Sequence, residues 1–424
     1  MKCDYGKEGL EISIDPNWNV DIIKPKKQKV IKNPIKVISR AIKNPIGCPP
    51  LREIIKKKQN VNSVCIVVSD ATRPVPSHII LEALVKELKN YGIREEQINI
   101  LVATGLHRKS REGELKHILG NNLSTRIKVI DHQATDNDSL KFLGNTTDKV
   151  PIYINKLYYE SELKILTGYV EPHFFFGFSG GCKSIVPGIA GEKTIQGNHS
   201  AENIASPYSR FGVFEKNLMR KNSIEISRSV HVDFIVNVCI NEEHKITKVA
   251  AGDSEKAHEN LVNFQLKHVF KEISEPYDIV VCGNGGYPLD LNLYQAVKSM
   301  AIGELAVKKG GVIISVNELS DGIGHDNFRE LIFSGQASEK IYQKILKKEI
   351  FVSDQWEIQI LSRILMNSEI FVISKLKKEE IGNIGLKYAK SVEEAIDKAL
   401  KKHGNNAKIL ILPNGPQILP LQRN

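Results

Sequence analysis

The sequence has no long apolar stretch. No apolar run approaches the roughly 20 residues that a helix needs to cross a bilayer. The first residues, MKCDYGKEGLEISID, have no apolar core of the kind found in signal peptides. Hydrophobic residues make up 41% of the chain and charged residues 25%, which is ordinary for a globular protein. We therefore expect a cytoplasmic protein with no membrane partner.

Cysteine is scarce, and its spacing argues against a structural role. No C-x-x-C pair occurs among the six cysteines, at positions 3, 48, 65, 182, 239 and 282. Most lie in apolar runs such as SVCIVVS and IVVCGNGG, which are typical of buried, reduced thiols. We expect neither a disulfide nor a zinc–cysteine site.

Positive charge is plentiful, but the features that accompany nucleic-acid binding are missing. The net charge is +10, and much of the excess lies in KPKKQKVIKNPIKVISRAIKNPIG and REIIKKK. No aromatic residues are interleaved there, and no helix-turn-helix or RNA-binding signature is present. The segment is better explained as the solvated basic face of helices, so we expect no nucleic-acid partner.

The chain, at 424 residues, is too long for one ordinary core, so two domains are expected. Short β-branched runs at 63–70, 98–104, 126–132 and 163–170 predict strands, and 78–92 predicts an amphipathic helix ending at Gly92. The pattern restarts near 277 with a strand, a helix over 291–311 and a strand over 311–318. This alternation predicts an α/β fold with two Rossmann-like domains, mainly parallel sheets and a cleft between them. The expected domains are 1–268 and a smaller 276–400, with FKEISEP (270–276) as the linker.

Polar residues follow several of these predicted strands. Asp70, His107 and His173 each come shortly after one. Ligands of parallel α/β sheets bind outside the carboxyl ends of the strands, so one cleft could collect all three. By contrast, His258, His268 and His403 lie on polar helical stretches and are expected at the surface.

The stretch GFSGGCKSIVPG resembles a phosphate-binding loop but lacks one of its parts. Gly177 and Lys183-Ser184 have the spacing of that loop, whereas Cys182 replaces its second glycine. Pro187 would also break the helix that should follow. An ATP- or GTP-type phosphotransferase is therefore disfavoured. The glycines would instead let a flat ligand lie close to the backbone.

Zinc-site spacing is missing as well, since His173 and His199 lie 26 residues apart without an acidic partner at a fixed offset. Arg73, in the stiff loop DATRPVPS, offers a fork for a carboxylate or phosphate, or else a loop salt bridge with Asp70. Tyr294 and Lys298 share one face of a predicted helix, which is either a ligand face or an ordinary amphipathic one. The preceding GNGGYP is not a dinucleotide fingerprint.

Five motifs together resemble the nickel-pincer-nucleotide lactate racemases and their relatives: DATRP, ATGLHR, GYVEPHFFFGFSGGCKSIVPGIAG, NHS and YQAVKSM. They occur in the family's order and span nearly the whole chain. The resemblance implies a pyridinium-3,5-dithiocarboxylate mononucleotide bound covalently to Lys183, and nickel held by this cofactor and by His199. It implies His107 and His173 as the acid/base pair, and Arg73 and Lys298 as partners of the substrate carboxylate. Tyr294 and Gln295 are expected at the substrate, and the cofactor is expected to contact Asp70, Ala71, Thr72, Arg73, Pro187, Gln295, Lys298 and Trp356.

The implied activity is racemisation of lactate by reversible hydride transfer from C2 to the cofactor. Imidazole, with an ordinary pKa of about 6.5, is too weak to remove a carbon-bound proton, but it can remove the hydroxyl proton as hydride leaves. Opposite hydroxyl positions in the two enantiomers require two bases. Expected partners are lactate or a similar 2-hydroxy acid, and the enzymes that make the cofactor and insert nickel. Residues 408–424 are expected to return to the first domain. A racemase or epimerase of another 2-hydroxy acid and a non-enzymatic nickel- or nucleotide-binding protein remain alternatives.

Overall fold

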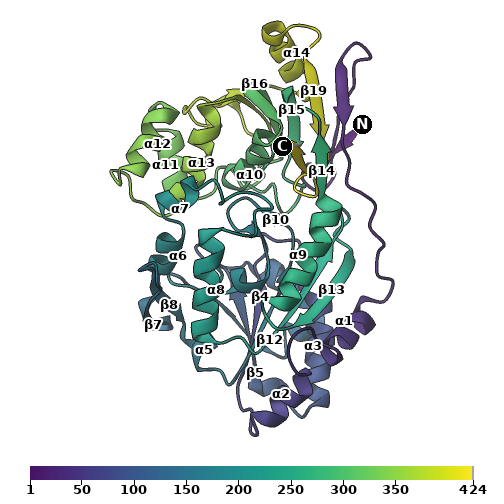
Figure 1. Ribbon diagram of the computed structural model, residues 1–424, viewed down its shortest axis with the longest axis vertical. Coiled ribbons are helices and arrows are strands. Elements are labelled where there is room, and N and C mark those ends of the chain that lie inside the picture. Colours follow the sequence, from purple (N-terminus) through teal and green to yellow (C-terminus); the bar gives the residue numbers. More distant parts are fainter. Residues whose placement is uncertain (423–424) are drawn as a thin grey trace. The chain divides into compact units, whose positions relative to one another are not determined.

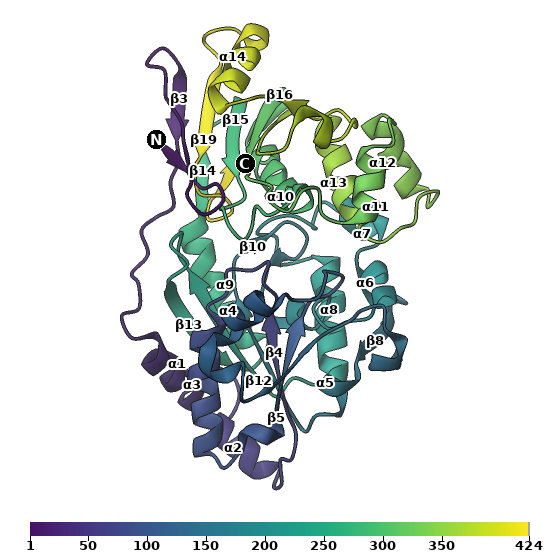
Figure 2. The ribbon, with the colours of Figure 1, turned by 180° about the vertical axis from the view of Figure 1, so that it is seen from behind.

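The computed structural model describes residues 1–422 and divides the chain into two units, each built on its own six-stranded sheet (Figures 1 and 2). We call residues 27–203 and 207–267 the middle unit. Residues 1–26, 204–206 and those from His268 onward form the terminal unit, because it includes both ends of the chain.

The sheet of the middle unit has the order β13-β12-β9-β4-β5-β6 and is parallel except at β13. Its strands are β4 (Val64–Ser69), β5 (Ile98–Ala103), β6 (Lys128–Asp131), β9 (Leu163–Tyr169), β12 (Phe234–Ile240) and β13 (Ile246–Gly252). The inner strands are buried on both faces, as their β-branched runs predict. One core unites the sheet with α1 (Pro34–Lys43), α2 (Leu51–Lys57), α3 (Ser77–Asn90) and α4 (Glu112–Leu123).

The middle unit also contains two short strand pairs, a 3₁₀ turn and further helices. They are β7 (Leu140–Asn145), β8 (Pro151–Asn155), α5 (Lys156–Glu160), β10 (Pro172–His173), β11 (Gly177–Phe178), a 3₁₀ turn (Gly181–Ser184), α6 (Glu192–Asn198), α8 (Leu218–Val230) and α9 (Lys256–Val269).

The sheet of the terminal unit is wholly parallel and has the order β18-β17-β16-β15-β19-β3. Its strands are β3 (Asn19–Ile22), β15 (Tyr277–Gly283), β16 (Val307–Val316), β17 (Glu369–Ile373), β18 (Lys387–Tyr388) and β19 (Lys408–Leu412). Alternate strand residues face opposite ways. One set packs with α14 (Val392–His403), and α10 (Leu293–Glu304) packs on the other face. The unit also contains α11 (Asp326–Ile332), α12 (Ser338–Leu346) and α13 (Gln355–Leu365), the pair β1 (Lys2–Cys3) and β2 (Leu10–Glu11), and the pair β14 (Phe270–Ile273) and β20 (Leu419–Gln422).

The structure corrects the predicted domain boundaries at both ends of the chain. Residues 1–26 belong to the terminal unit, not to the N-terminal domain, because β3 pairs with β19 and completes the sheet. The tail also stays there and does not return to the first domain, since β19 pairs with β15 and β20 pairs with β14. The predicted linker at 270–276 therefore contains a strand.

Two local predictions also need correction. The helix predicted over 291–311 ends at Glu304, and the following lysines and glycines already lie in β16. His258 is buried, not at the surface, because its Nε2 bonds to the Ser179 carbonyl at 2.7 Å. All six cysteines are free, as predicted.

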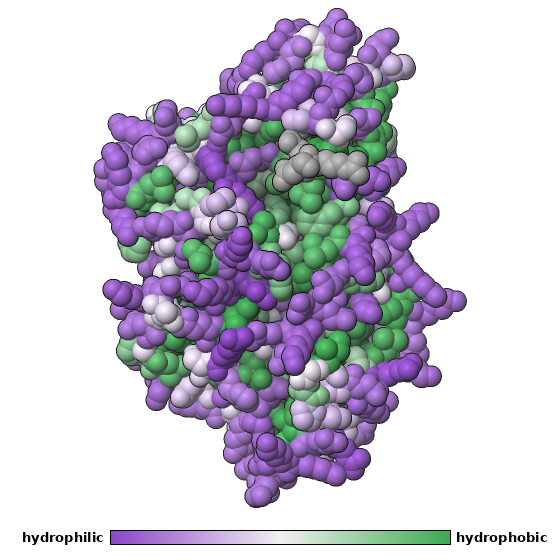
Figure 3. Space-filling view, in the orientation of Figure 1, coloured by the Kyte–Doolittle hydropathy of each residue, from purple (hydrophilic) through white to green (hydrophobic). Residues whose placement is uncertain are grey.

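The face of the molecule drawn in Figure 3 is mainly polar. On the face drawn in Figure 3, hydrophilic side chains predominate and apolar ones form smaller patches between them. Within the described residues, no helix combines the length and apolar character needed to cross a membrane.

Candidate active site

Three predicted site residues follow three neighbouring strands of the middle unit. Asp70 comes directly after β4, His107 follows β5, and His173 lies in β10 just after β9. Because β9, β4 and β5 are adjacent and parallel, their carboxyl ends meet at one edge of the sheet. The rule for parallel sheets therefore placed these residues correctly.

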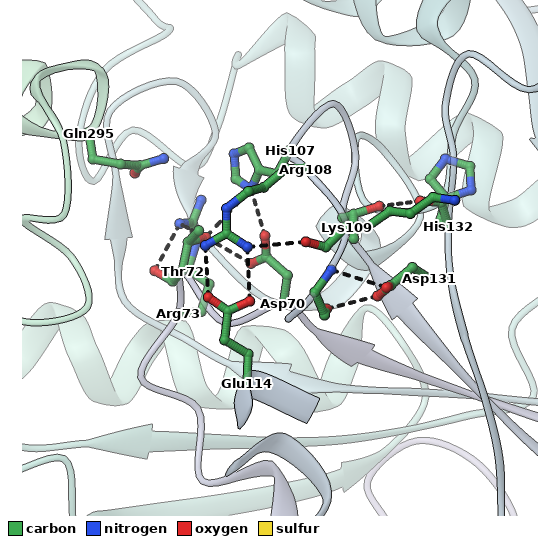
Figure 4. A network of polar contacts seen from close by, with 12 residues as sticks. Asp70, Thr72, Arg73, His107, Arg108, Lys109, Glu114, Asp131, His132 and Gln295 are labelled. Atoms are coloured by element: carbon green, nitrogen blue, oxygen red, sulfur yellow. Dashed lines mark hydrogen bonds and ion pairs between the residues drawn. The ribbon is translucent and has the colours of Figure 1, made fainter. Parts of the chain in front are cut away.

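Asp70 and His107 form a closely bonded pair (Figure 4). The His107 Nδ1 lies 2.6 Å from Asp70 Oδ2, and Thr72 Oγ1 donates to Asp70 Oδ1 at 2.8 Å. Arg73 Nη1 in turn donates to Thr72 Oγ1 at 2.8 Å. Arg108, next in the chain to His107, forms two contacts to Glu114 at 2.7 and 2.9 Å and so ties this loop to α4.

The charge of Asp70 is secured by its neighbours. Burial alone would raise the pKa of this carboxyl, but His107, Arg73 and the Thr72 hydroxyl outweigh burial and lower it to about 2. Asp70 is therefore ionised at neutral pH and can only accept hydrogen bonds. It follows that His107 carries a proton on Nδ1, so the neutral ring has its lone pair on Nε2.

The Nδ1 atom of His173 accepts hydrogen bonds, whereas that of His107 donates one. Its side chain is buried, and its Nδ1 accepts from the backbone N–H groups of Phe175 at 3.2 Å and Phe176 at 3.4 Å. A nitrogen that accepts two N–H groups holds a lone pair, so the proton of the neutral ring lies on Nε2. The hairpin of β10 and β11, in which His173 pairs with Gly177, fixes this geometry.

Lys183 lies on the 3₁₀ turn at Gly181–Ser184, and its amine is 5.5 Å from the centre of the Phe176 ring. Burial and the nearby Arg73 guanidinium lower its pKa to about 7, against an opposing effect of Asp70 and Glu171. A large fraction of this amine is therefore neutral at pH 7, which makes it a nucleophile.

His199 ends α6 and is buried, and its Nδ1 lies 3.1 Å from the Ile195 carbonyl. A carbonyl only accepts, so the ring proton is on Nδ1 and Nε2 carries the lone pair that binds metals. The centre of its ring lies 5.6 Å from the centre of the Phe176 ring. The centre of the His173 ring lies 5.7 Å from the same point.

Phe176 therefore joins three predicted site residues, His173, Lys183 and His199, in one apolar cage. We did not single it out from the sequence, although the run FFF directly after His173 was a signal. Glu171 was also missed. It is buried, bonds to the Tyr169 hydroxyl and acts electrostatically on Lys183.

The other middle-unit predictions support this cage. The segment with Pro187 is bonded to the His107 loop, since Gly105 N–H donates to the Gly188 carbonyl at 3.0 Å. Ala71 packs against the core of the unit.

The glycines of GFSGG serve packing within the protein. A Cβ on Gly180 would lie 2.9 Å from Asn237 Oδ1, and one on Gly181 would lie 2.8 Å from His258. These contacts explain the glycines by packing, and the expectation that they let a flat ligand lie close to the backbone stays a prediction.

The remaining predicted residues lie in the terminal unit. Tyr294, Gln295 and Lys298 lie on α10, where the Lys298 amine bonds to the Gln295 side chain. Trp356 begins α13, and its Nε1 donates to the Tyr294 hydroxyl at 2.9 Å. The structure thus brings Tyr294 and Trp356 together, although they are far apart in sequence.

Comparison with known proteins matches both halves of the chain to one family. The model of the lactate racemase N-terminal domain matches residues 5–212, and that of the lactate racemase C-terminal domain matches residues 273–419. The chain belongs to the lactate racemase family. Lactate racemase of Thermoanaerobacterium thermosaccharolyticum is 36% identical over 424 residues, covering 99% of this chain and 98% of that protein. Lactate racemase of Lactiplantibacillus plantarum is 38% identical over 381 residues, covering 89% of each.

Solved structures agree with this family assignment. The lactate racemase apoprotein from T. thermosaccharolyticum superimposes with a TM-score of 0.90 at 35% identity, covering 100% of this chain and 99% of that one. A protein from Thermotoga maritima, at a TM-score of 0.71 and 18% identity, shares the fold.

The residues of the middle unit fit the cofactor that the family resemblance implies. A buried imidazole with its Nε2 lone pair suits nickel, and a partly neutral amine suits a covalent bond to the cofactor. Within residues 1–422, no group of three or more His, Cys, Asp or Glu side chains converges on a metal position. A single protein ligand is what a nickel held mainly by its cofactor would need.

Proposed function

We propose that this chain is a racemase that interconverts D- and L-lactate with a nickel-pincer nucleotide bound covalently at Lys183. The observation that carries the proposal is the cage around Phe176. It combines a nucleophilic lysine, the His199 imidazole with a lone pair on Nε2 and a second histidine, His173, all within 6 Å of one ring. When bound, the cofactor would accept the hydride from C2 of the substrate.

His107 is suited to take the substrate hydroxyl proton. Its Nε2 carries the lone pair in the neutral ring, because Nδ1–H is held by Asp70. After proton transfer the ring is a cation, and the Asp70 carboxylate stabilises that charge. Asp70 thus orients the base and compensates its charge.

His173 serves the opposite hydroxyl position, in a different way. With its proton on Nε2, it donates a hydrogen bond to the substrate oxygen. To act as a base at Nε2 it must first change tautomer, so that the proton leaves Nε2 and Nδ1 carries one instead, which breaks its contacts with the Phe175 and Phe176 amides. The two halves of the reaction are therefore chemically unequal in this protein.

The substrate carboxylate needs a fixed cation while C2 inverts. Arg73 uses Nη1 on Thr72 and so holds its planar fork in one orientation. Lys298, with Tyr294 and Gln295, is proposed to contact the same substrate, and Trp356 the cofactor, as the family resemblance implies. Asp70, Ala71, Thr72 and Pro187 are proposed to line the cofactor pocket.

The decisive experiment combines mass spectrometry with turnover. The chain is expressed beside the cofactor-making and nickel-inserting enzymes, and its intact mass and nickel content are measured. We expect an adduct on Lys183, nickel that is lost in His199→Ala, and racemisation of lactate. His107→Ala and His173→Ala should retain the adduct and lose turnover.

A panel of 2-hydroxy acids assayed in parallel identifies the substrate. Lys183→Arg, which keeps a basic side chain of similar length but has no amine that can be acylated, is the matched control for the adduct. An unmodified Lys183 in a co-expressed sample would refute the proposal, and preferred turnover of another 2-hydroxy acid would correct the substrate.

A further inference from the structure

A second polar cluster lies inside the terminal unit. Its residues are far in sequence from those of the Phe176 cage. It consists of Tyr294, His325, Asp354 and Trp356, which we call the Tyr294 cluster. Tyr294, Asp354 and Trp356 are each 5–6% exposed, and His325 is partly buried. Neither His325 nor Asp354 was suggested by the sequence.

The hydrogen bonds of the cluster have a determined direction. The Trp356 Nε1–H can only donate, so the Tyr294 oxygen accepts it at 2.9 Å. The Tyr294 hydroxyl then donates to Asp354 Oδ1 at 3.1 Å, and His325 Nδ1 bonds to Asp354 Oδ2 at 2.5 Å. Burial, followed by the charge of Asp354, raises the pKa of Tyr294 well above its usual range, so this hydroxyl keeps its proton.

The rings of the cluster are equally constrained. His325 stacks on Tyr294 with ring centres 4.3 Å apart and planes within 7°. The centre of the Phe328 ring lies 5.5 Å from that of Tyr294, and the two rings are nearly perpendicular at 85°. Gly324, with φ of +103°, packs so closely that a Cβ would lie 2.9 Å from Tyr294. Tyr294 is thus constrained by two neighbouring rings, by Gly324 and at its hydroxyl.

The backbone around the cluster is also unusual. The Tyr294, His325 and Asp354 positions lie at the starts of three helices, α10, α11 and α13. Asp354 has φ of +67°, in the left-handed region, which aspartate adopts more readily than most residues but less readily than glycine. A buried carboxylate is costly too, and apolar side chains would stabilise such a core as well or better. These costs indicate a role beyond holding the fold together.

We propose that Asp354 and His325 are positioning residues, which hold Tyr294 and Trp356 in a single orientation for the substrate and cofactor. The proposal rests on the proposed function, in which these two aromatic residues contact the ligands. Because the Tyr294 hydroxyl already donates to Asp354, Tyr294 acts as a fixed wall and not as a proton donor. His325 contributes both a ring that supports Tyr294 and an N–H that orients Asp354.

The orientation can be tested without cofactor, by fluorescence. The chain has two tryptophans, so Trp18→Phe leaves Trp356 as the sole emitter. In that background, Asp354→Asn and His325→Phe should shift the Trp356 emission maximum and increase its quenching by acrylamide. His325→Asn keeps an N–H at the position of Nδ1 and should restore much of the original spectrum. The control is His231→Phe, which removes a histidine–aspartate contact of 3.0 Å at a largely exposed side chain of the middle unit and should leave the Trp356 spectrum unchanged.

The functional readout is turnover of the cofactor-loaded enzyme. We expect kcat/KM to fall about tenfold to a hundredfold in Asp354→Asn and His325→Phe, the size expected for a small misplacement of a substrate contact. The Lys183 adduct and nickel content should match the parent, and His325→Asn should recover part of the loss. His231→Phe should keep full activity.

Two outcomes would overturn the proposal. Normal kcat/KM in Asp354→Asn and His325→Phe, with a shifted Trp356 spectrum, would make the cluster merely structural. An unshifted spectrum in both variants would show that they do not orient Trp356 at all. A loaded parent enzyme without turnover on any 2-hydroxy acid would instead reject the proposed function, and this inference with it.

Discussion

At the scale of residues, three histidines differ in the hydrogen bond that each makes through Nδ1. His107 donates from Nδ1 to a carboxylate, His173 accepts at Nδ1 from backbone amides, and His199 donates from Nδ1 to a carbonyl. The partner of Nδ1 decides what Nε2 can do. The sequence identified all three positions through the family resemblance, but none of these partners.

Asp70→Asn tests the link between Asp70 and His107. An amide cannot replace the carboxylate charge and can turn its NH₂ toward His107, so the ring proton is no longer held on Nδ1. We expect kcat for racemisation to fall about 10²- to 10⁴-fold while the Lys183 adduct remains. In ¹⁵N spectra of histidine-labelled protein, the His107 signals should move toward the other tautomer and those of His173 should not. Unchanged kcat would remove Asp70 from the mechanism.

The lowered pKa of Lys183 predicts its reactivity. Only the neutral amine can be acetylated, so acetylation of Lys183 in cofactor-free protein should rise as the pH passes through about 7. This is the pKa that burial and Arg73 give the amine. In denaturant the same residue should label only near the ordinary lysine pKa of about 10.4. Arg73→Gln removes a neighbouring cation and should shift the midpoint upward. Peptide mass spectrometry after brief acetylation measures each profile, and coincident folded and unfolded profiles would contradict the prediction.

At the scale of elements, the segment from β10 to the 3₁₀ turn is shaped by its contacts with the rest of the middle unit. Gly181 adopts φ of +54°, and its N–H donates to Asn237 Oδ1 at 2.8 Å. His258, on α9, occupies the space that a side chain at Gly181 would need. The turn that presents Lys183 is therefore built by β12 and α9, which come later in the chain.

Gly181→Ala should expose this dependence. The substitution combines a left-handed backbone with a contact of 2.8 Å to His258, so we expect a loss of about 1–3 kcal/mol in the free energy of unfolding. Gly113→Ala is the matched control. It lies in α4 with nothing within 4 Å of its Cβ, and it should be neutral or stabilising by up to about 1 kcal/mol. Chemical denaturation measures the free energy of unfolding of both variants. Equal values for the two would contradict the prediction.

At the scale of the whole molecule, the two ends of the chain build one unit. β3 pairs with β19, and Cys3 and Ile12 enter the same core as α14. The terminal unit therefore depends on residues separated from most of it by the entire middle unit in sequence. A chain lacking 2–24 loses an edge strand and part of that core.

We expect such a truncated chain to lose hydrogen-exchange protection in β19 and α14 while β4 and β5 keep theirs. The exposed edge of β19 should also promote association. Hydrogen-exchange mass spectrometry and light scattering measure the two effects. Retained protection in β19 would mean that the unit is stable without its N-terminal strand.

The sequence by itself determined the α/β class, the positions of most strands and the three polar residues at their carboxyl ends, because these follow from local periodicity and one rule of parallel sheets. The tertiary structure alone decided which strands join each sheet, where the tail lies and what each Nδ1 contacts. Such features depend on hydrogen bonds between distant residues, as between His107 and Asp70 or His325 and Asp354. Local pattern carries no information about those partners, so Phe176 and the Tyr294 cluster became visible only in the folded chain.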